Sequence, residues 1–487
     1  MRIPLSTAAA LAALAAFATA LVGCGSSSTT PCQDNKGFCT SDTGGGNDSG
    51  ADPDSDPFQE FDSSTEAGPP CVGLKCQQVT CQSGKTTVSG KVYDPQAKNP
   101  IYNVFVYVPN APLQPFSAGV TCTACQAPAS GSPVVSTSTK PDGTFVLEDV
   151  PVGTDIPLVL QVGKWRRKVN IATVTACQDN PQADKTLHLP KNKAEGDIPL
   201  IALATGCDQA ECFIRNTIGL DPAEFTGPTG NGRVHLYRGD DISQGLPANP
   251  GDAYALWGNL TTMKKYDLIF NACECSPDKR DTAGPAYTNM KSYLEAGGRV
   301  FGTHYHYNWF ASSAQCSSFD NCNGPTDFAS VAEWQQAKYL SEPYLINTTL
   351  PKGKALADWY ANVTKSTTYA APYGQLPLVD VRNDVGKVTT TKATQWIYTG
   401  TQQNYDTYYL SFNTPVNQPV QNQCGKAVFS DVHLIDSLSN YSSSWPSSCT
   451  GTGFEDHKPN ELALEFLFFD LSSCIQDETQ PPPPIPN

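Results

Sequence analysis

The feature that most constrains the fold is a series of short, continuously apolar runs between residues 196 and 475, separated by segments of helical character. The runs cover residues 198–204, 234–237, 266–272, 299–302 and 426–431. Helices are predicted over residues 208–218, 286–296 and 461–473. Continuously apolar strands are buried on both faces, and their alternation with helices is typical of parallel sheets. We therefore predict an α/β domain with a mostly parallel sheet over residues 196–475.

A different pattern, of strands and turns, covers residues 71–190. Short β-type runs lie at 86–94, 104–108, 144–147 and 156–162, and a Lys-Pro-Asp-Gly turn signal stands at 140–143. Several short strands with turn residues between them indicate an all-β sandwich. Trp165, Arg166 and Arg167 follow the last of these runs. We expect them to be the solvated end of a strand with Trp165 partly packed; a basic, aromatic binding spot is the alternative.

This all-β region resembles carboxypeptidase regulatory-like, or transthyretin-like, domains. The matching segments read VSGKVYD from Val88, VFVYVPN from Val104 and KPDGTFVLEDVPVGT from Lys140. The resemblance covers roughly 100 residues. It implies a seven-stranded sandwich that serves as an accessory module and carries no catalytic residues.

The N-terminus has the features of an export signal. Arg2 is followed by an apolar run over 8–22 that is rich in Ala and Leu, and small residues precede Cys24. The ending Leu-Val-Gly-Cys resembles a bacterial lipobox, which implies removal of residues 1–23 and a membrane anchor of acyl chains on Cys24. Because Gly25 and not Asp follows, the resemblance points to the outer membrane of a Gram-negative bacterium. An ordinary signal peptide cut near Ala20 is the alternative.

Composition adds limits on partners and on the terminal segments. Residues 24–70 are Gly, Ser, Asp, Thr and Pro with little apolar content, which predicts a disordered tether, and residues 476–487 form a Pro-rich tail. The net charge of −15 disfavours nucleic acid as a partner. No second apolar run of transmembrane length is present, so the lipid is the only predicted anchor.

The 18 cysteines favour an oxidising, exported setting with disulfide bonds. Without Cys24 their number is odd, so at least one thiol is expected to be free or paired between chains. We expect a structural disulfide between Cys122 and Cys125. Cys273 and Cys275 lie too close in sequence for an easy mutual disulfide, so each is expected to pair elsewhere or to be the odd thiol; a metal role is the lesser alternative.

Polar residues follow three of the predicted parallel strands. Glu274 follows the run at 266–272, and His304 and His306 follow 299–302. Asp431 ends the run at 426–431, and His433 follows it. Ligands bind at the carboxyl ends of strands in open α/β sheets, so these residues are the predicted site. The polar stretch at 311–420 is expected to fold over it as loops and short helices, pinned by Cys316 and Cys322.

The same segments resemble the class I glutamine amidotransferase-like superfamily, and especially its trehalose-utilisation-protein-like branch. The matching pieces are YDLIFNACE, AGGRVFGTHYHYNWF, GKAVFSDVH and NELALEFLFFDL. The resemblance implies a flavodoxin-like fold with His304 at the position of the nucleophilic Cys and His433 at the position of the general-base His. Because the Cys is replaced, the usual glutamine hydrolysis is not expected.

Two functions therefore remain open. In the leading one the protein is non-catalytic and binds a carbohydrate or another envelope ligand, or acts as a scaffold; the aromatic rings of Tyr305, Tyr307 and Trp309 beside His306 and Asp431 would line the cleft. In the other, His304, His433 and Glu274 are catalytic residues of a hydrolase. His304, His306 and His433 are then the candidate ligands of a divalent metal such as zinc.

Overall fold

The computed structural model describes residues 71–122, 129–239, 246, 249–274, 284–317, 322–401, 403–434, 445–450 and 453–483. The predicted signal peptide over 1–23, the anchor Cys24 and the tether over 24–70 lie outside these residues. All described residues belong to one compact unit that begins at Gly68. None of the described helices is long and apolar enough to cross a membrane.

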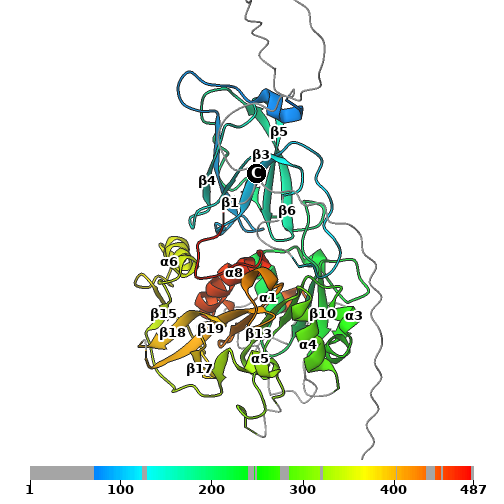
Figure 1. The fold of residues 1–487 in the computed structure, drawn as a ribbon, viewed down its shortest axis with the longest axis vertical. Helices are drawn as coiled ribbons and strands as arrows, with labels where there is room; N and C mark the ends of the chain where they lie inside the picture. Colours follow the sequence, from blue (N-terminus) through cyan, green and yellow to red (C-terminus); the bar gives the residue numbers. More distant parts are fainter. Residues whose placement is uncertain are drawn as a thin grey trace, which may run out of the picture. The chain divides into compact units, whose positions relative to one another are not determined.

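The first region consists of two small sheets (Figure 1). One has the order β4-β1-β7 and the other the order β3-β2-β5-β6. Their bounds are β1 Thr87–Tyr93, β2 Phe105–Pro109, β3 Pro133–Ser138, β4 Thr144–Glu148, β5 Gly153–Val162, β6 Trp165–Val174 and β7 Leu187–His188, after a short helix η1 Gly73–Gln77. These two sheets confirm that this region is β-rich. Side chains from both sheets, such as Val92 and Leu160, share one apolar core.

The second region is built on an 11-stranded sheet of the order β11-β10-β8-β12-β13-β20-β19-β18-β15-β16, with β9 beside β10. The strands are β8 Ile201–Thr205, β9 Phe225–Thr226, β10 Val234–Arg238, β11 Gly251–Asp252, β12 Leu268–Asn271, β13 Arg299–Thr303, β15 Tyr344–Ile346, β16 Gln375–Leu376, β18 Thr394–Gly400, β19 Tyr405–Thr414 and β20 Gly425–Ser430. All pairs from β11 to β20 are parallel, so their carboxyl ends share one edge.

Helices cover both faces of the parallel strands. The helices are α1 Ala210–Phe213, η2 Ile214–Ile218, η3 Pro222–Glu224, α2 Ala253–Trp257, α3 Leu260–Met263, α4 Ala286–Glu295, η5 His304–Trp309, α5 Thr326–Ala329, α6 Pro351–Thr364, η6 Val420–Asn422, η8 Ser447–Cys449, α7 Gly453–Asp456 and α8 Lys458–Ser472. Within β8, Leu203 packs in the core with α1 and α8, whereas Ala202 packs in the core with α2 and α4. This two-sided burial explains the continuous apolar runs in the sequence.

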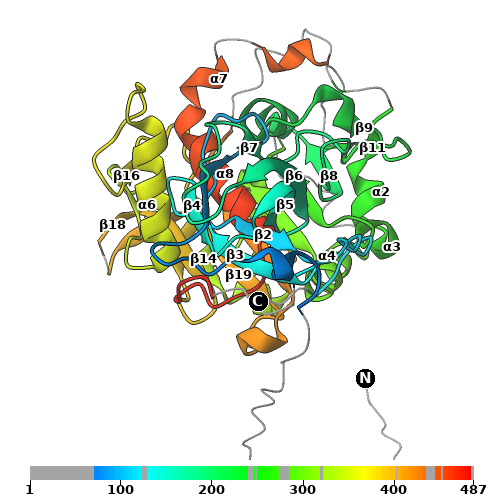
Figure 2. The same cartoon turned by 90° about the horizontal axis from the view of Figure 1, so that it is seen from above.

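The stretch at 311–420 differs from its prediction. Besides short helices such as α5, which were expected, it supplies β15, β16, β18 and β19, which extend the sheet in antiparallel pairing. It also supplies the two-stranded sheet of β14 Ala332–Trp334 and β17 Val385–Val388, and helix α6, which contacts β15 and lies beside β16 and β18 in Figure 2. The polar composition concealed these strands, although the Thr and Tyr residues in it favour strands. Polar side chains also bond across the sheet, as Trp396 Nε1 does to Ser411 Oγ at 2.9 Å.

Disulfide bonds join parts of the chain that are distant in sequence. The described pairs are Cys71–Cys76, Cys81–Cys177, Cys122–Cys424, Cys212–Cys449 and Cys316–Cys322. The predicted Cys122–Cys125 bond is wrong, because the loop that carries Cys122 lies against Gly297, beside the start of β20, where Cys424 is within reach. Cys125 and Cys275 lie outside the described part of the chain, as do Cys32 and Cys39.

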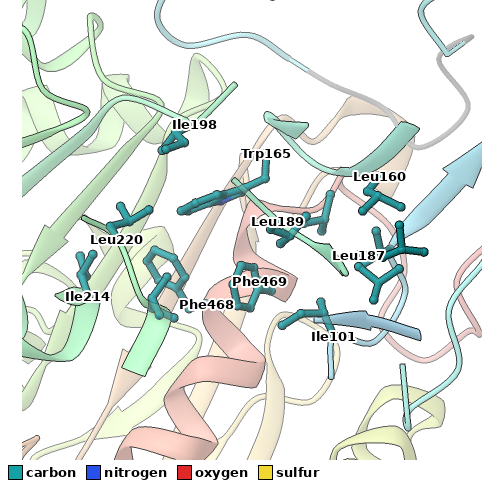
Figure 3. Packing of buried hydrophobic residues seen from close by; sticks show 14 of the residues in the cluster. Ile101, Leu160, Trp165, Leu187, Leu189, Ile198, Ile214, Leu220, Phe468 and Phe469 are labelled. Atoms are coloured by element: carbon teal, nitrogen blue, oxygen red, sulfur yellow. The ribbon is translucent and has the colours of Figure 1, made fainter. Parts of the chain in front are cut away.

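Trp165 joins the first region to helix α8, as Figure 3 shows. Its side chain is fully buried, its ring centroid lies 5.8 Å from that of Phe469, and its Nε1 donates to Ser472 Oγ at 3.3 Å. The expectation of a solvated strand end is therefore wrong. Trp165 begins β6, and the apolar surface that covers it comes from a helix about 300 residues later in the chain.

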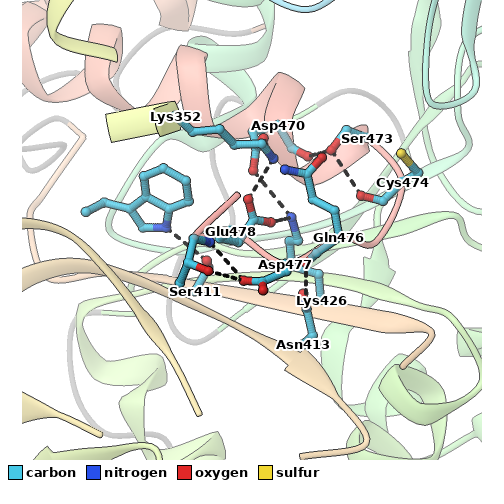
Figure 4. Close-up of polar contacts among 12 residues, drawn as sticks. Lys352, Ser411, Asn413, Lys426, Asp470, Ser473, Cys474, Gln476, Asp477 and Glu478 are labelled. Carbon is cyan, nitrogen blue, oxygen red and sulfur yellow. Dashed lines mark hydrogen bonds and ion pairs between the residues drawn. The ribbon is translucent and has the colours of Figure 1, made fainter. Parts of the chain in front are cut away.

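The segment after α8 is held by buried ion pairs (Figure 4). Lys352 Nζ lies 2.7 Å from Glu478 Oε2, and Lys426 also contacts Glu478 and lies 3.4 Å from Asp470. Both lysines are fully buried, so the carboxylates compensate charges that would otherwise be costly to bury. The folded part therefore extends beyond the predicted boundary at 475.

A second set of buried acids links the first region to α8. Asp94 accepts hydrogen bonds from the backbone N–H groups of Lys98 and Asn99, and Asn99 Nδ2 donates to Glu465 Oε2 at 2.7 Å. Burial raises the pKa of Asp94 to about 6, against the effect of these donors. Burial and the charge of Asp94 also raise the pKa of Glu465.

We expect these raised pKa values to make stability depend on pH. The folded protein holds the protons more tightly than the unfolded chain does, so stability falls as pH rises through the window between about 4 and 6. Glu465→Gln removes one of the two buried charges. At pH 7.5 it should increase the free energy of unfolding by about 1–2 kcal/mol and raise the melting temperature, whereas at pH 4 it should not. Glu148→Gln, at an exposed position, is the control. If Glu465→Gln raised the melting temperature equally at both pH values, repulsion between Asp94 and Glu465 would not be the cause.

Candidate functional site

The carboxyl ends of four neighbouring parallel strands bring four polar side chains together. Asp208 follows β8, Cys273 follows β12, His304 follows β13 directly, and His433 follows β20. All four residues are at least nine-tenths buried. They come from positions spread over more than 200 residues of the chain, and the parallel register of the strands aligns them.

Cys273 and His304 are in direct contact. Cys273 Sγ lies 3.0 Å from His304 Nδ1, and the thiol also donates to the Glu274 carbonyl oxygen at 3.1 Å. Among the described cysteines, Cys273 is the free one. His304 has a φ of +41° at the turn from β13 into η5, a conformation that is uncommon for residues other than Gly. Such local strain is often found at functional sites.

His433 is oriented by Asp208. His433 Nδ1 lies 2.7 Å from Asp208 Oδ1, and Thr303 Oγ1 donates to the other carboxylate oxygen at 3.0 Å. Thr303 Oγ1 in turn accepts the Cys273 backbone N–H at 2.7 Å. An ionised carboxylate accepts from Nδ1–H, which leaves the lone pair of His433 Nε2 available.

Cys273, His304 and His433 can act together as ligands. Each offers one ligand atom, and these atoms lie within 4.8 Å of one another. A thiolate and two imidazoles are ligands that zinc prefers, and three protein ligands leave the fourth tetrahedral position for water or substrate. The carboxylate behind His433 is the outer partner that metal-binding histidines commonly have.

The two histidines differ in their electrostatic surroundings. Burial, together with His433, Arg382 and His306, lowers the pKa of His304 to about 2, so its ring is neutral. Burial also opposes protonation of His433, but the Asp208 carboxylate outweighs it and raises the pKa. Burial and the charge of Asp208 raise the pKa of the Cys273 thiol well above its ordinary value.

Acidic residues lie on the other side of His304. Asp384 Oδ2 is 3.7 Å from His304 Nε2, and the Asp384 backbone N–H donates to Asp431 Oδ2 at 2.7 Å. Burial, followed by the nearby Asp384, raises the pKa of Asp431 well above its ordinary value. The predicted residue Asp431 therefore stands behind Asp384 and not among the three candidate ligands.

His306 is held by neighbours on both ring nitrogens. Nε2 lies 2.8 Å from the Ala272 carbonyl oxygen, and Nδ1 accepts from Trp309 Nε1 at 2.9 Å. Tyr307 and Trp309 are buried in the core with α2 and α4. Of the predicted aromatic residues, Tyr305 is the one beside the cluster, since its ring centroid lies 3.9 Å from that of His304.

Glu274 is close in sequence but points elsewhere. It is buried, and a Cβ added at Gly239, after β10, would lie 2.6 Å from its Oε1. Sequence reasoning missed Asp208 and Asp384, and it gave Cys273 a metal role only as the lesser alternative. Asp208 and Cys273 both follow apolar strands, which was a usable signal, whereas Asp384 comes from the stretch that was expected to fold as loops and short helices.

Comparisons with known proteins give little help. No protein-family model matches the chain, and no curated protein matches it. A type II cohesin–X-dockerin complex from Acetivibrio cellulolyticus aligns at 16% identity over 25% of this chain and 76% of that chain, with a TM-score of 0.15. A 9R-lipoxygenase from Cyanothece aligns at 8% identity over 73% of this chain and 45% of that chain, with a TM-score of 0.11. These likenesses are too weak to bear on fold or function.

Proposed function

We propose that the chain is an exported, metal-dependent hydrolase whose centre is the ligand set Cys273, His304 and His433. The observation that carries this proposal is the convergence of the three ligand atoms within 4.8 Å at the carboxyl ends of adjacent strands. The proximity of His304 and His433, with ring centroids 4.8 Å apart, and the carboxylate of Asp208 add to it. A zinc ion would act there as a Lewis acid for hydrolysis.

The protein's own groups have separate roles in this proposal. Asp208 holds the Nδ1–H of His433 and orients its ring, and Thr303 fixes the second oxygen of Asp208. Asp384, at 3.7 Å from His304 Nε2, is the carboxylate placed to hold or accept a proton beside the cluster. The burial of Cys273, His304 and His433 would limit the access of bulk water to the ligand atoms.

The fold class that we propose follows from strand order. With β8 as the first strand, the order β10-β8-β12-β13-β20 is 2-1-3-4-5, that of flavodoxin-like folds. The two small sheets, of three and four strands, support a transthyretin-like sandwich. The strained turn at His304 supports a relationship to amidotransferase-like domains in which His replaces the nucleophilic Cys.

The main alternative is a reaction in which the Cys273 thiol is the nucleophile. Cys273 contacts His304, and His304 in turn lies beside Asp384. The thiolate is the reactive form of Cys. Since Cys273 is fully buried and its pKa is raised, little thiolate would form without a metal. The predicted carbohydrate-binding role, which used the rings of Tyr305, Tyr307 and Trp309, is less favoured because the rings of Tyr307 and Trp309 are buried.

The test is the metal content of the purified protein by elemental mass spectrometry, with Cys273→Ser and His433→Gln beside it. We expect about one zinc per chain, lost in both variants and kept in His188→Gln, a half-buried histidine of the first region. Hydrolysis of ester and amide test substrates should be lost with a chelator. Wild-type protein without metal after growth in zinc would overturn the proposal.

We also propose that the mature chain is anchored by lipid at Cys24 to the outer membrane. The disulfide bonds among the described residues support an oxidising compartment. The mass of the mature N-terminal peptide tests this proposal: acyl chains on Cys24 are expected, and an unmodified terminus near residue 20 would contradict it.

A further inference from the structure

The segment 379–384, between β16 and β17, pairs with the chain around His433. Val381 and Val432 form an antiparallel bridge. Beside it, the His433 backbone N–H donates to the Asp380 carbonyl oxygen at 3.2 Å. A regular antiparallel ladder would return a bond from this segment to the His433 carbonyl oxygen. Asp380 has a φ of +48°, which turns the backbone out of the strand conformation there, so the buried oxygen needs a donor from elsewhere.

Asn460 supplies this donor. It is fully buried in the first turn of helix α8. Its Nδ2 donates to the carbonyl oxygens of His433 and Val379, each at 2.7 Å, and its Oδ1 accepts the Val379 backbone N–H at 3.1 Å. The nitrogen and the oxygen of the amide are therefore both engaged, as a buried amide requires. One side chain ties α8 to the segment 379–384 and to the backbone of His433.

Both of the tied segments carry groups of the candidate site. The ring of His433 is oriented by Asp208, whose Oδ1 lies 2.7 Å from its Nδ1. The segment 379–384 ends at Asp384, whose Oδ2 lies 3.7 Å from His304 Nε2. A functional site requires its groups to be held within about 0.5 Å of the productive geometry. A shift of the His433 backbone would therefore separate its ring from the other ligand atoms.

We propose that Asn460 is a positioning residue of this site. It acts through the backbone of His433 and Val379 and not as a ligand. Through His433 it holds one ring where the three ligand atoms can share an ion, and through Val379 it keeps Asp384 beside His304. The inference rests on the proposed metal-dependent function, and it adds α8 to the elements that build the centre.

Asn180 offers a matched control, because its side chain makes the same kind of contacts in the first region. Its Oδ1 accepts the Thr175 backbone N–H at 2.8 Å, and its Nδ2 donates to the carbonyl oxygens of Thr175 and Thr87 at 3.1 and 3.0 Å. Asn460→Leu and Asn180→Leu each remove the partner of several backbone groups, so both should lower the melting temperature. Only Asn460→Leu should disturb the candidate site.

Two measurements report on the site. Competition with a chromogenic chelator gives the zinc affinity, which should be at least about tenfold weaker in Asn460→Leu and unchanged in Asn180→Leu. Proton NMR of the metal-free protein at a fixed pH follows the Nδ1–H signal of His433, which is assigned by its loss in His433→Gln. This signal should shift or broaden in Asn460→Leu and not in Asn180→Leu, because the hydrogen bond to Asp208 depends on the position of the ring.

If Asn460→Leu keeps the wild-type zinc affinity and the wild-type His433 signal, Asn460 serves stability alone and the proposal is wrong. If Asn460→Leu does not fold, Asn460→Asp takes its place and is judged by the same two measurements, since it keeps the shape and the acceptor but lacks the Nδ2 donors. If the wild-type protein binds no zinc, the proposed function fails, whereas the His433 signal still decides whether Asn460 positions that ring.

Discussion

Asp208→Asn is expected to weaken zinc binding by about 10- to 100-fold, because outer-shell partners of metal-binding histidines have effects of this size. Asp208 lies 2.7 Å from His433 Nδ1 and is fully buried. Asn has nearly the same shape and can still accept from Nδ1–H, but it lacks the negative charge that makes His433 a better ligand. Hydrolytic activity should fall in parallel. Competition with a chromogenic zinc chelator measures the affinity.

The control for this variant is Asp358→Asn, which changes an acid on helix α6 that pairs with Lys354 at 2.7 Å near the surface. Its zinc affinity should match that of the wild type. If Asp208→Asn binds zinc as tightly as the wild type while Cys273→Ser does not bind it, Asp208 has no outer-shell role. If Asp208→Asn loses its fold, its melting temperature without metal will show this directly.

Trp165→Ala is expected to lower the free energy of unfolding by about 3–5 kcal/mol, the usual cost of removing a large buried aromatic side chain. The ring is fully buried against Phe468 and Phe469 of α8, so the deletion leaves a cavity between the first region and this helix. The melting temperature should fall, and limited proteolysis should cut the region around β6 sooner. Differential scanning calorimetry measures the melting temperature.

Two further variants separate packing from other effects. Trp165→Phe keeps most of the apolar volume and loses the hydrogen bond to Ser472, so we expect a loss of only about 1 kcal/mol. Tyr339→Ala removes an aromatic ring that is 78% exposed and should change little. A wild-type melting temperature for Trp165→Ala would mean that this junction contributes nothing to the stability of the protein.

Much of the parallel sheet was predictable because its strands are buried on both faces. The apolar runs that became β8, β10, β12, β13 and β20 and the helices that became α4 and α8 were predicted within a few residues of their observed bounds. The antiparallel strands were missed because their polar residues bond within the sheet, which periodicity does not reveal. Trp165 was misjudged because the helix that buries it lies far along the chain.

By itself, the sequence determined which strands are parallel and buried, and hence that His304 and His433 reach one edge of a sheet. Local chemistry sufficed, because apolar periodicity depends only on neighbouring residues. The tertiary structure decided which other groups meet them there: Cys273 with its free thiol, Asp208 behind His433, and Asp384 from the antiparallel part. Contacts between residues so far apart depend on strand order and register, and those are set when the whole core packs together.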